Sequence, residues 1–284
     1  MARIVGGIGI SHTPSMGLEY DIGLKSGFSP NWQKWFDGTR AAHEWLMRTR
    51  PDRLVIVYND HLNHFDFDAY PTLAIGVAEQ FGQADEGWGA RPLPDLKGDT
   101  AFGWHLTNAL VQGHFDLTVC QNLAVDHGIY SWFPYLVDEP WEIPIVPIAV
   151  NVVRQPFPTS ERLYALGQAL RTAIQAFPSD EQVVVIGTGG MSHQTCGTRF
   201  GISNERLDSY FLDRLRPNVR ELIEIPQEEM MRVGGAEAAE LAIWFSMRGA
   251  LSDDISEVTR FYTFPALTGC GVIVFEEPKA QQHS

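Results

Sequence analysis

Positively charged residues, cysteines and long apolar runs are all scarce in this sequence. The 284 residues include 21 Lys and Arg against 35 Asp and Glu, which gives a formal net charge of -14. A surface of this sign argues against nucleic acid or an anionic membrane as the main partner. It leaves a small anionic ligand open, because the local field of a pocket can oppose the charge of the whole protein.

The three cysteines are odd in number and far apart, with no CxxC pair: Cys120, Cys196 and Cys270. This usage is typical of a reducing compartment and fits neither a disulfide framework nor a zinc ribbon. The first residues, MARIVGGIGI, lack the charged start, long apolar stretch and cleavage site of a secretory signal. No apolar run approaches the roughly 18 residues of a membrane-spanning helix. We therefore expect a cytoplasmic protein that does not interact with a membrane.

The apolar segments that are present recur as short runs rich in β-branched residues. Such continuous runs are typical of strands buried on both faces of a sheet. They cover residues 3–10, 53–58, 72–78, 115–121, 143–153, 182–187 and 269–276. Helix-like segments lie between them, at about 32–48, 100–113, 160–177, 204–215 and 235–249. Strands that alternate with helices predict an α/β fold whose sheet is at least partly parallel.

Two long segments, residues 64–99 and 125–144, fit neither pattern. The first is rich in Gly, Pro and acidic residues, and the second in aromatic residues and Pro. Long ordered loops of a compact domain tend to be functional. Neither segment has the composition of a flexible linker, so we predict one catalytic domain over residues 1–284.

Four of the nine histidines follow predicted strands: His12, His61, His127 and His193. The crevice outside the carboxyl ends of parallel strands is where ligands bind in an α/β sheet. The alternative is that each is an ordinary loop histidine, but four at equivalent places favour one shared site. Asp60 and Asp126, each next to one of these histidines, are candidates for orienting an imidazole or for capping a loop.

A carboxylate completes the set of candidate ligands. In the helix pattern of residues 234–251, Glu240 shares an apolar face with Ile243 and Met247, and a buried carboxylate needs a cation or hydrogen bonds. Glu237 is the competing acid, nearer the start of the helix. Two imidazoles and one carboxylate are the ligand set of non-haem Fe(II) enzymes, and the same set can hold catalytic zinc. The residue pattern indicates a mononuclear metal site with further histidines for acid–base chemistry.

Several strings resemble a known family, the class III (type II) extradiol dioxygenases, and in particular the catalytic β subunit of protocatechuate 4,5-dioxygenase. The resemblance runs from about residue 2 to 275, and its motifs occur in the family's order. They are ISHTP, VYNDH, PTLAIG, ADEGWGARPLPDLKG, VDHG, VNVV, GTGGMSHQ and GAEAAELAIWFSMRGAL.

The resemblance implies a central, mostly parallel sheet flanked by helices and an extradiol cleavage of catecholic aromatic acids with O2, in the catabolism of aromatic and lignin-derived compounds. It implies that His12, His61 and Glu240 ligate Fe(II). His193 matches the family's catalytic acid–base histidine. His127 matches its second active-site histidine, which lies near the substrate hydroxyl.

The region that binds the substrate carboxylate departs from the family pattern. The string FPALTGCGVIV lacks the family's Ser-Asn-Thr and leaves Thr268 as a candidate donor to the substrate. Gallate and 3-O-methylgallate are therefore as reasonable as protocatechuate. The chain also lacks a small α-subunit-like domain, so we expect a homo-oligomer, a hetero-oligomer with a small lid subunit, or a lid from its own residues 128–142. The alternative functions are a zinc hydrolase and a non-catalytic binding protein of the same fold.

Overall fold

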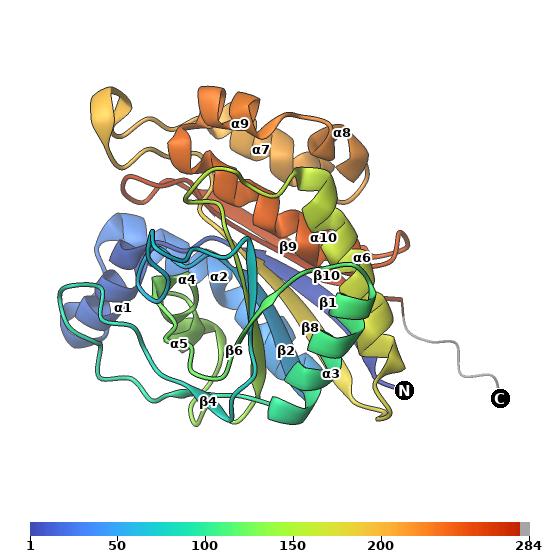
Figure 1. The fold of residues 1–284 in the computed structure, drawn as a ribbon. Helices are drawn as coiled ribbons and strands as arrows, with labels where there is room; N and C mark the ends of the chain where they lie inside the picture. Colours follow the sequence, from blue (N-terminus) through green and yellow to red (C-terminus); the bar gives the residue numbers. More distant parts are fainter. Residues whose placement is uncertain (279–284) are drawn as a thin grey trace.

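Eight strands form one sheet in the order β6-β3-β7-β2-β8-β1-β10-β9. Figure 1 shows this sheet with the helices that flank it. The computed structural model describes residues 1–278. The strands are β1 (Arg3–Ile10), β2 (Arg53–Tyr58), β3 (Leu73–Gly76), β6 (Thr118–Cys120), β7 (Ile145–Val150), β8 (Gln182–Thr188), β9 (Ser256–Thr263) and β10 (Cys270–Glu276). Each predicted run contains one of these strands, whereas β9 was not predicted because its residues are polar and largely exposed.

The centre of the sheet is parallel, and an antiparallel pair joins it to the outer strands on each side. β2 pairs in parallel with both β7 and β8, and β8 pairs in parallel with β1. β10 and β9 add two antiparallel strands beyond β1, and β3 runs antiparallel to β7. The prediction of a central, mostly parallel sheet flanked by helices is confirmed. Strands β2, β8 and β1 therefore end side by side at the same edge.

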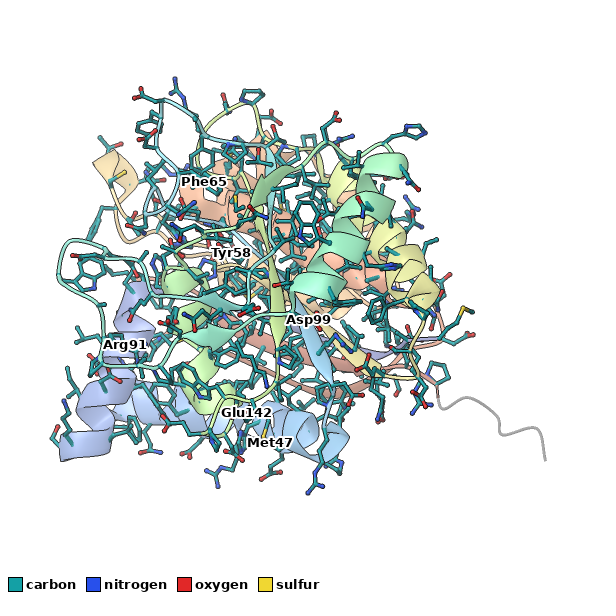
Figure 2. The ribbon with its side chains drawn as sticks, turned by 60° about the horizontal axis from the view of Figure 1, so that its bottom comes forward. Met47, Tyr58, Phe65, Arg91, Asp99 and Glu142 are labelled. Carbon is teal, nitrogen blue, oxygen red and sulfur yellow. The ribbon has the colours of Figure 1, made fainter. Side chains whose placement is uncertain are left out.

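Helices cover both faces of this sheet, which explains the unbroken apolar strands. Alternate residues of β2 enter different cores: Val55 and Val57 pack on one side, and Leu54, Ile56 and Tyr58 on the other. Side chains fill the space between the sheet and the helices on each side (Figure 2). One core is formed with α3 (Thr100–Gln112), α6 (Ser160–Ala176), α7 (Glu205–Arg214) and α10 (Trp244–Ala250); the other is formed with α2 (Pro30–Thr49), α4 (His127–Tyr130) and α5 (Phe133–Leu136).

Four of the five predicted helices are confirmed with ends within two residues, and the fifth is divided. Residues 235–249 form a 3₁₀ helix, η2 (Ala236–Ile243), followed by α10. The remaining helices are α1 (Pro14–Ser26), α8 (Val219–Ile223) and α9 (Gln227–Gly234). Helix α1 was missed because its apolar residues do not gather on one face; Leu18 and Leu24 are exposed. Within residues 1–278, no helix is both long and apolar enough to cross a membrane.

Both unassigned segments contain short ordered elements. Residues 64–99 contain β3 and a small hairpin of β4 (Gln80–Phe81) and β5 (Leu96–Lys97). Residues 125–144 contain α4 and α5, and the side chains of Tyr130, Trp132 and Phe133 in this segment are buried in the core. Several apolar side chains of residues 128–142 belong to the core, and the expectation that these residues form a lid stays a prediction.

Candidate active site

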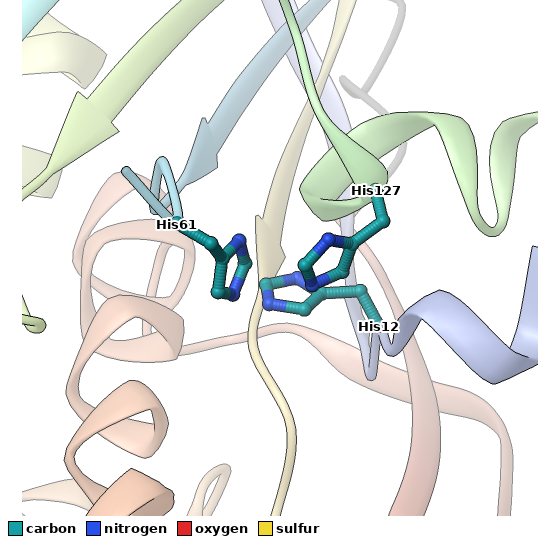
Figure 3. Close-up of side chains that lie close together, drawn as sticks. All are labelled: His12, His61 and His127. Carbon is teal, nitrogen blue, oxygen red and sulfur yellow. The ribbon is translucent and has the colours of Figure 1, made fainter. Parts of the chain in front are cut away.

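Three neighbouring parallel strands deliver histidines to one edge of the sheet. His12 follows β1, His61 follows β2, and His193 follows β8 after a short turn. His127, the first residue of α4, approaches the same place. The ring centroid of His12 lies 5.0 Å from that of His61 and 5.5 Å from that of His127. Figure 3 shows these three rings converging from separate segments.

His12 presents a free lone pair to the centre of the cluster. Its Nδ1 lies 2.9 Å from Thr188 Oγ1, and the Thr188 hydroxyl donates to the carbonyl oxygen of Gly128 at 3.4 Å. With that hydroxyl proton used, Nδ1–H of His12 is the donor to Thr188, and Nε2 is unprotonated. Burial lowers the pKa of His12 to about 4. His12 Nε2 is buried without a hydrogen-bond partner, which is the expected state of a ligand atom.

Asp126 orients His61 from behind. Its Oδ2 accepts the backbone N–H of His61 at 2.7 Å and lies 2.9 Å from His61 Nδ1. Burial lowers the pKa of His61, but the charge and hydrogen bond of Asp126, together with Glu240, outweigh it and raise that pKa well above 6.5. Asp60 instead accepts backbone N–H groups of Asn63, His64 and Phe65. Of the two carboxylates considered from the sequence, Asp126 orients an imidazole and Asp60 caps a loop.

Glu240 closes the cluster from the 3₁₀ helix η2. Its Oε2 lies 3.4 Å from His12 Nε2 and its Oε1 lies 3.6 Å from His61 Nε2. Burial raises its pKa, but the neighbouring imidazoles of His12 and His61 lower it well below 4.5. The backbone N–H of Gly190 donates to Oε2 at 2.6 Å. The competing acid Glu237 lies elsewhere and accepts hydrogen bonds from Thr195.

Two glycines after β8 allow η2 to approach the sheet this closely. A Cβ on Gly189 would lie 2.6 Å from the carbonyl oxygen of Glu240. A Cβ on Gly190 would lie 2.5 Å from Cε1 of His193 and 3.1 Å from Glu240 Oε2. The GTGGMSH string therefore places a carboxylate and a histidine against one backbone segment that has no room for side chains.

Two overlapping donor sets can hold a metal ion. The ligand atoms of His12, His61 and His127 all lie within 4.8 Å of one another. The second set replaces His127 by Glu240. The rings of His61 and His127 are stacked, with their centroids 3.9 Å apart and an angle of 29° between their planes. The lone pairs lie in the ring planes, so those of the two stacked rings run side by side and do not meet at one point. Metal–nitrogen distances of about 2.1 Å place neighbouring ligand atoms about 3 Å apart, which favours the set with Glu240.

His193 is held in one tautomer beside this cluster. Its Nδ1–H donates to the carbonyl oxygen of Met191 at 2.7 Å, so Nε2 is the ring nitrogen left for other contacts. The preceding residue, Ser192, donates from its backbone N and its hydroxyl to Asp208, at 2.9 and 2.6 Å. Thr268 forms an antiparallel bridge with His193 and is buried. The structure thus brings the candidate substrate-binding threonine next to the candidate acid–base histidine.

His127 has its own carboxylate partner, Glu86. Glu86 Oε1 accepts the backbone N–H of His127 at 2.9 Å, and Glu86 Oε2 lies 2.6 Å from His127 Nδ1. Sequence reasoning missed the roles of Glu86, Thr188 and Asp208, because the contacts join residues far apart in the chain. The string ADEGWG was a recognisable signal, but nothing in it singles out the glutamate.

Three other histidines, His43, His64 and His105, have ordinary structural roles. His43 Nδ1 lies 3.3 Å from the carbonyl oxygen of Leu136, and His105 Nε2 lies 2.8 Å from that of Ala173. His64 Nδ1 accepts the backbone N–H of Ala124 at 3.2 Å. These contacts separate them from the four histidines that gather at the sheet edge.

Comparisons with known proteins agree with this arrangement. Residues 6–274 match the family described as "Catalytic LigB subunit of aromatic ring-opening dioxygenase". The chain is 39% identical over 195 residues to a gallate dioxygenase of Pseudomonas putida, a match that covers 68% of this chain and 57% of that protein. It is 30% identical over 216 residues to a 2,3-dihydroxyphenylpropionate/2,3-dihydroxicinnamic acid 1,2-dioxygenase of Rhodococcus, covering 75% of this chain and 64% of that protein.

A solved structure supports the fold alone. An uncharacterized protein from Escherichia coli K12 superposes with a TM-score of 0.60 at 13% identity, covering 95% of this chain and 99% of that one. The two enzyme relatives are longer, and less than two thirds of each is matched. On the family match, which spans nearly the whole chain, this protein belongs to the family of catalytic LigB subunits of aromatic ring-opening dioxygenases.

Proposed function

We propose that this chain is the catalytic part of a non-haem Fe(II) extradiol dioxygenase, which opens the ring of a catecholic aromatic acid with O2. The observation that carries the proposal is the convergence of two imidazole Nε2 atoms and one carboxylate at the sheet edge. One of these atoms, His12 Nε2, is buried and has no hydrogen-bond partner, although Glu240 Oε2 lies 3.4 Å away. The names of the two enzyme relatives, both ring-cleaving dioxygenases of catecholic acids, support the same reaction.

His12, His61 and Glu240 fit an Fe(II) ion better than any other set here. Two neutral imidazoles and a carboxylate on one face form the ligand set that leaves open positions for substrate and O2. When bound, the ion supplies Lewis-acid activation of the diol and a route for electrons from the substrate to O2. Asp126 and Thr188 hold the two imidazoles with Nε2 directed inward.

His193 is the proposed acid–base residue. Its Nε2 is the free ring nitrogen, because Nδ1–H is bound to the carbonyl oxygen of Met191. Nε2 can take a proton from a substrate hydroxyl and return it when the O–O bond breaks. His127, stacked on the ligand His61, approaches the substrate hydroxyl from another side. Thr268, beside His193, is the proposed donor to a ring substituent.

The substrate class follows from the same residues and from the relatives. Gallate, 3-O-methylgallate and protocatechuate are the proposed candidates, in the cytoplasmic catabolism of aromatic and lignin-derived compounds. A second copy of the chain or a small lid subunit is the proposed partner that completes the enzyme. Leu267, next to Thr268, is 44% exposed at the site and offers an apolar contact to such a lid.

Oxygen uptake tests the proposal directly. Protein purified without O2 and loaded with Fe(II) should consume O2 with at least one of protocatechuate, gallate and 3-O-methylgallate, and less with plain catechol. No uptake with any of them would refute the dioxygenase assignment. His61→Ala should lose iron, while His193→Ala should keep iron and substrate binding but turn over slowly. Full iron occupancy in His61→Ala would show that the ligand assignment is wrong.

A further inference from the structure

We propose that Glu86 is a positioning residue, which holds His127 with Nδ1 protonated and thereby presents the Nε2 lone pair to the substrate hydroxyl. This inference rests on the proposed function, because the approach of His127 to a substrate is part of that function. Glu86 lies in the ADEGWG string, which the ligand set and the acid–base histidine leave without a role.

Both oxygens of the Glu86 carboxylate bind the same residue. Oε1 accepts the backbone N–H of His127 at 2.9 Å, and Oε2 lies 2.6 Å from its Nδ1. Both side chains are nearly buried, with 6% of Glu86 and 11% of His127 exposed. An ionised carboxylate only accepts hydrogen bonds, so Nδ1 must carry the proton. Two contacts to one residue fix the rotation of the ring as well as its tautomer.

The turn around Glu86 is built to direct this side chain inward. Asp85 Oδ1 accepts the backbone N–H groups of Gly87 at 2.9 Å and Gly89 at 3.0 Å. Both glycines have positive φ angles, of 92° and 84°, where a residue with a Cβ would be strained. Trp88, between the two glycines, is 65% exposed. Asp85 and the glycines therefore shape a turn in which Glu86 is the buried residue.

Backbone pairing places this turn beside His127. Ala84 N donates to the carbonyl oxygen of Val125 at 2.9 Å, and Val125 N donates to that of Gly82 at 2.9 Å. The segment before Glu86 thus runs along the segment before His127. Because this backbone pairing already fixes the segment that carries Glu86, the Glu86 side chain loses little conformational entropy when it binds His127.

The two stacked imidazoles each have a separate carboxylate. Asp126 orients His61, and Glu86 orients His127, the residue that follows Asp126 in the sequence. Without Glu86, the His127 ring can rotate or move its proton to Nε2. If Nε2 of His127 carries the proton, two hydrogen-bond donors, Nε2–H and the substrate hydroxyl, face each other, and the contact becomes unfavourable. The effect falls on turnover and leaves the His12, His61 and Glu240 ligands in place.

The tautomer is measured by ¹⁵N–¹H NMR correlations on metal-free protein labelled at histidine, with His127→Ala used for assignment. In the wild-type protein, Nδ1 of His127 should carry a proton. Glu86→Gln should move the proton to Nε2 or make the two forms exchange. The matched control is Glu142→Gln, because Glu142 is 72% exposed, pairs with Lys97 at 3.1 Å and lies outside the site (Figure 2). It should leave the His127 signals unchanged.

Kinetics provide the second readout. The kcat of Glu86→Gln should fall about 10- to 100-fold, with iron content unchanged and KM altered less than kcat. Glu86→Asp, which is too short to reach both N–H groups, should give an intermediate kcat and serves if Glu86→Gln fails to fold. An unchanged tautomer with kcat within about twofold of wild type would overturn the proposal. So would a wild-type His127 protonated at Nε2. Failure of the proposed function is distinct, because it shows as no O2 uptake by the wild-type enzyme.

Discussion

Asp126→Asn tests whether the orientation of His61 determines metal binding. The buried Asp126 carboxylate accepts four N–H groups: His61 N at 2.7 Å, His61 Nδ1 at 2.9 Å, Asn63 Nδ2 at 3.0 Å and Gly128 N at 2.9 Å. Three of them share Oδ2, and Gly128 N uses Oδ1. Asparagine has one acceptor oxygen, so its NH2 group must face at least one of these donors.

The magnitude follows from those contacts. If the amide oxygen takes the Oδ2 place, the N–H of Gly128 loses its partner at the start of α4, which costs about 1–3 kcal/mol. The three remaining bonds lose the strengthening that the charge provides, so the free energy of unfolding should fall by about 2–4 kcal/mol in all. Loss of the partner that orients a ligand histidine should weaken metal binding about 10- to 100-fold.

Urea unfolding of the metal-free protein and anaerobic Fe(II) titration against a chelator measure the two effects separately. Asp99→Asn is the matched control, because Asp99 also caps a helix, accepting Phe102 N at 2.8 Å, and binds a cationic partner, Arg53, at 2.6 Å. Asp99 lies at the start of α3 (Figure 2) and contacts no residue of the site. The Asp99→Asn variant should have a lower free energy of unfolding and the metal affinity of the wild-type protein. Wild-type affinity in Asp126→Asn would refute the reasoning.

Three further predictions follow from the site. Glu240→Gln should weaken metal binding at least tenfold whereas His127→Ala should retain the metal, and the reverse result in the same titration would identify the three-histidine set as the ligands. Because the metal-free His61 has a pKa raised well above 6.5 and binds a metal only when neutral, metal binding should release about one proton near pH 7 and strengthen as the pH rises, which calorimetry in buffers of different ionisation enthalpy detects. Asp208→Asn, which disturbs the two Ser192 hydrogen bonds next to His193, should lower kcat about tenfold at unchanged iron content, and equal kcat would show that Asp208 has no positioning role.

Local patterns were sufficient for the sheet because its central strands are buried on both faces. The run in β2 is apolar at every position from Leu54 to Tyr58, since alternate residues enter two different cores. Strand β9 and helix α1 had no such signal, because β9 is a largely exposed edge strand and α1 leaves several apolar residues exposed. The 3₁₀ form of η2 was also beyond the sequence pattern, because apolar spacing does not separate it from an α-helix over two turns.

The sequence by itself determined which side chains reach the edge of the sheet. His12, His61 and His193 follow three strands that proved to be neighbours and parallel, and strand ends of this kind meet at one edge. Only the tertiary structure decided how those side chains are aimed. Asp126 and Glu86 orient imidazoles through contacts between segments that are about 40 or more residues apart in the chain. Such contacts depend on how loops pack against one another, which no local periodicity encodes.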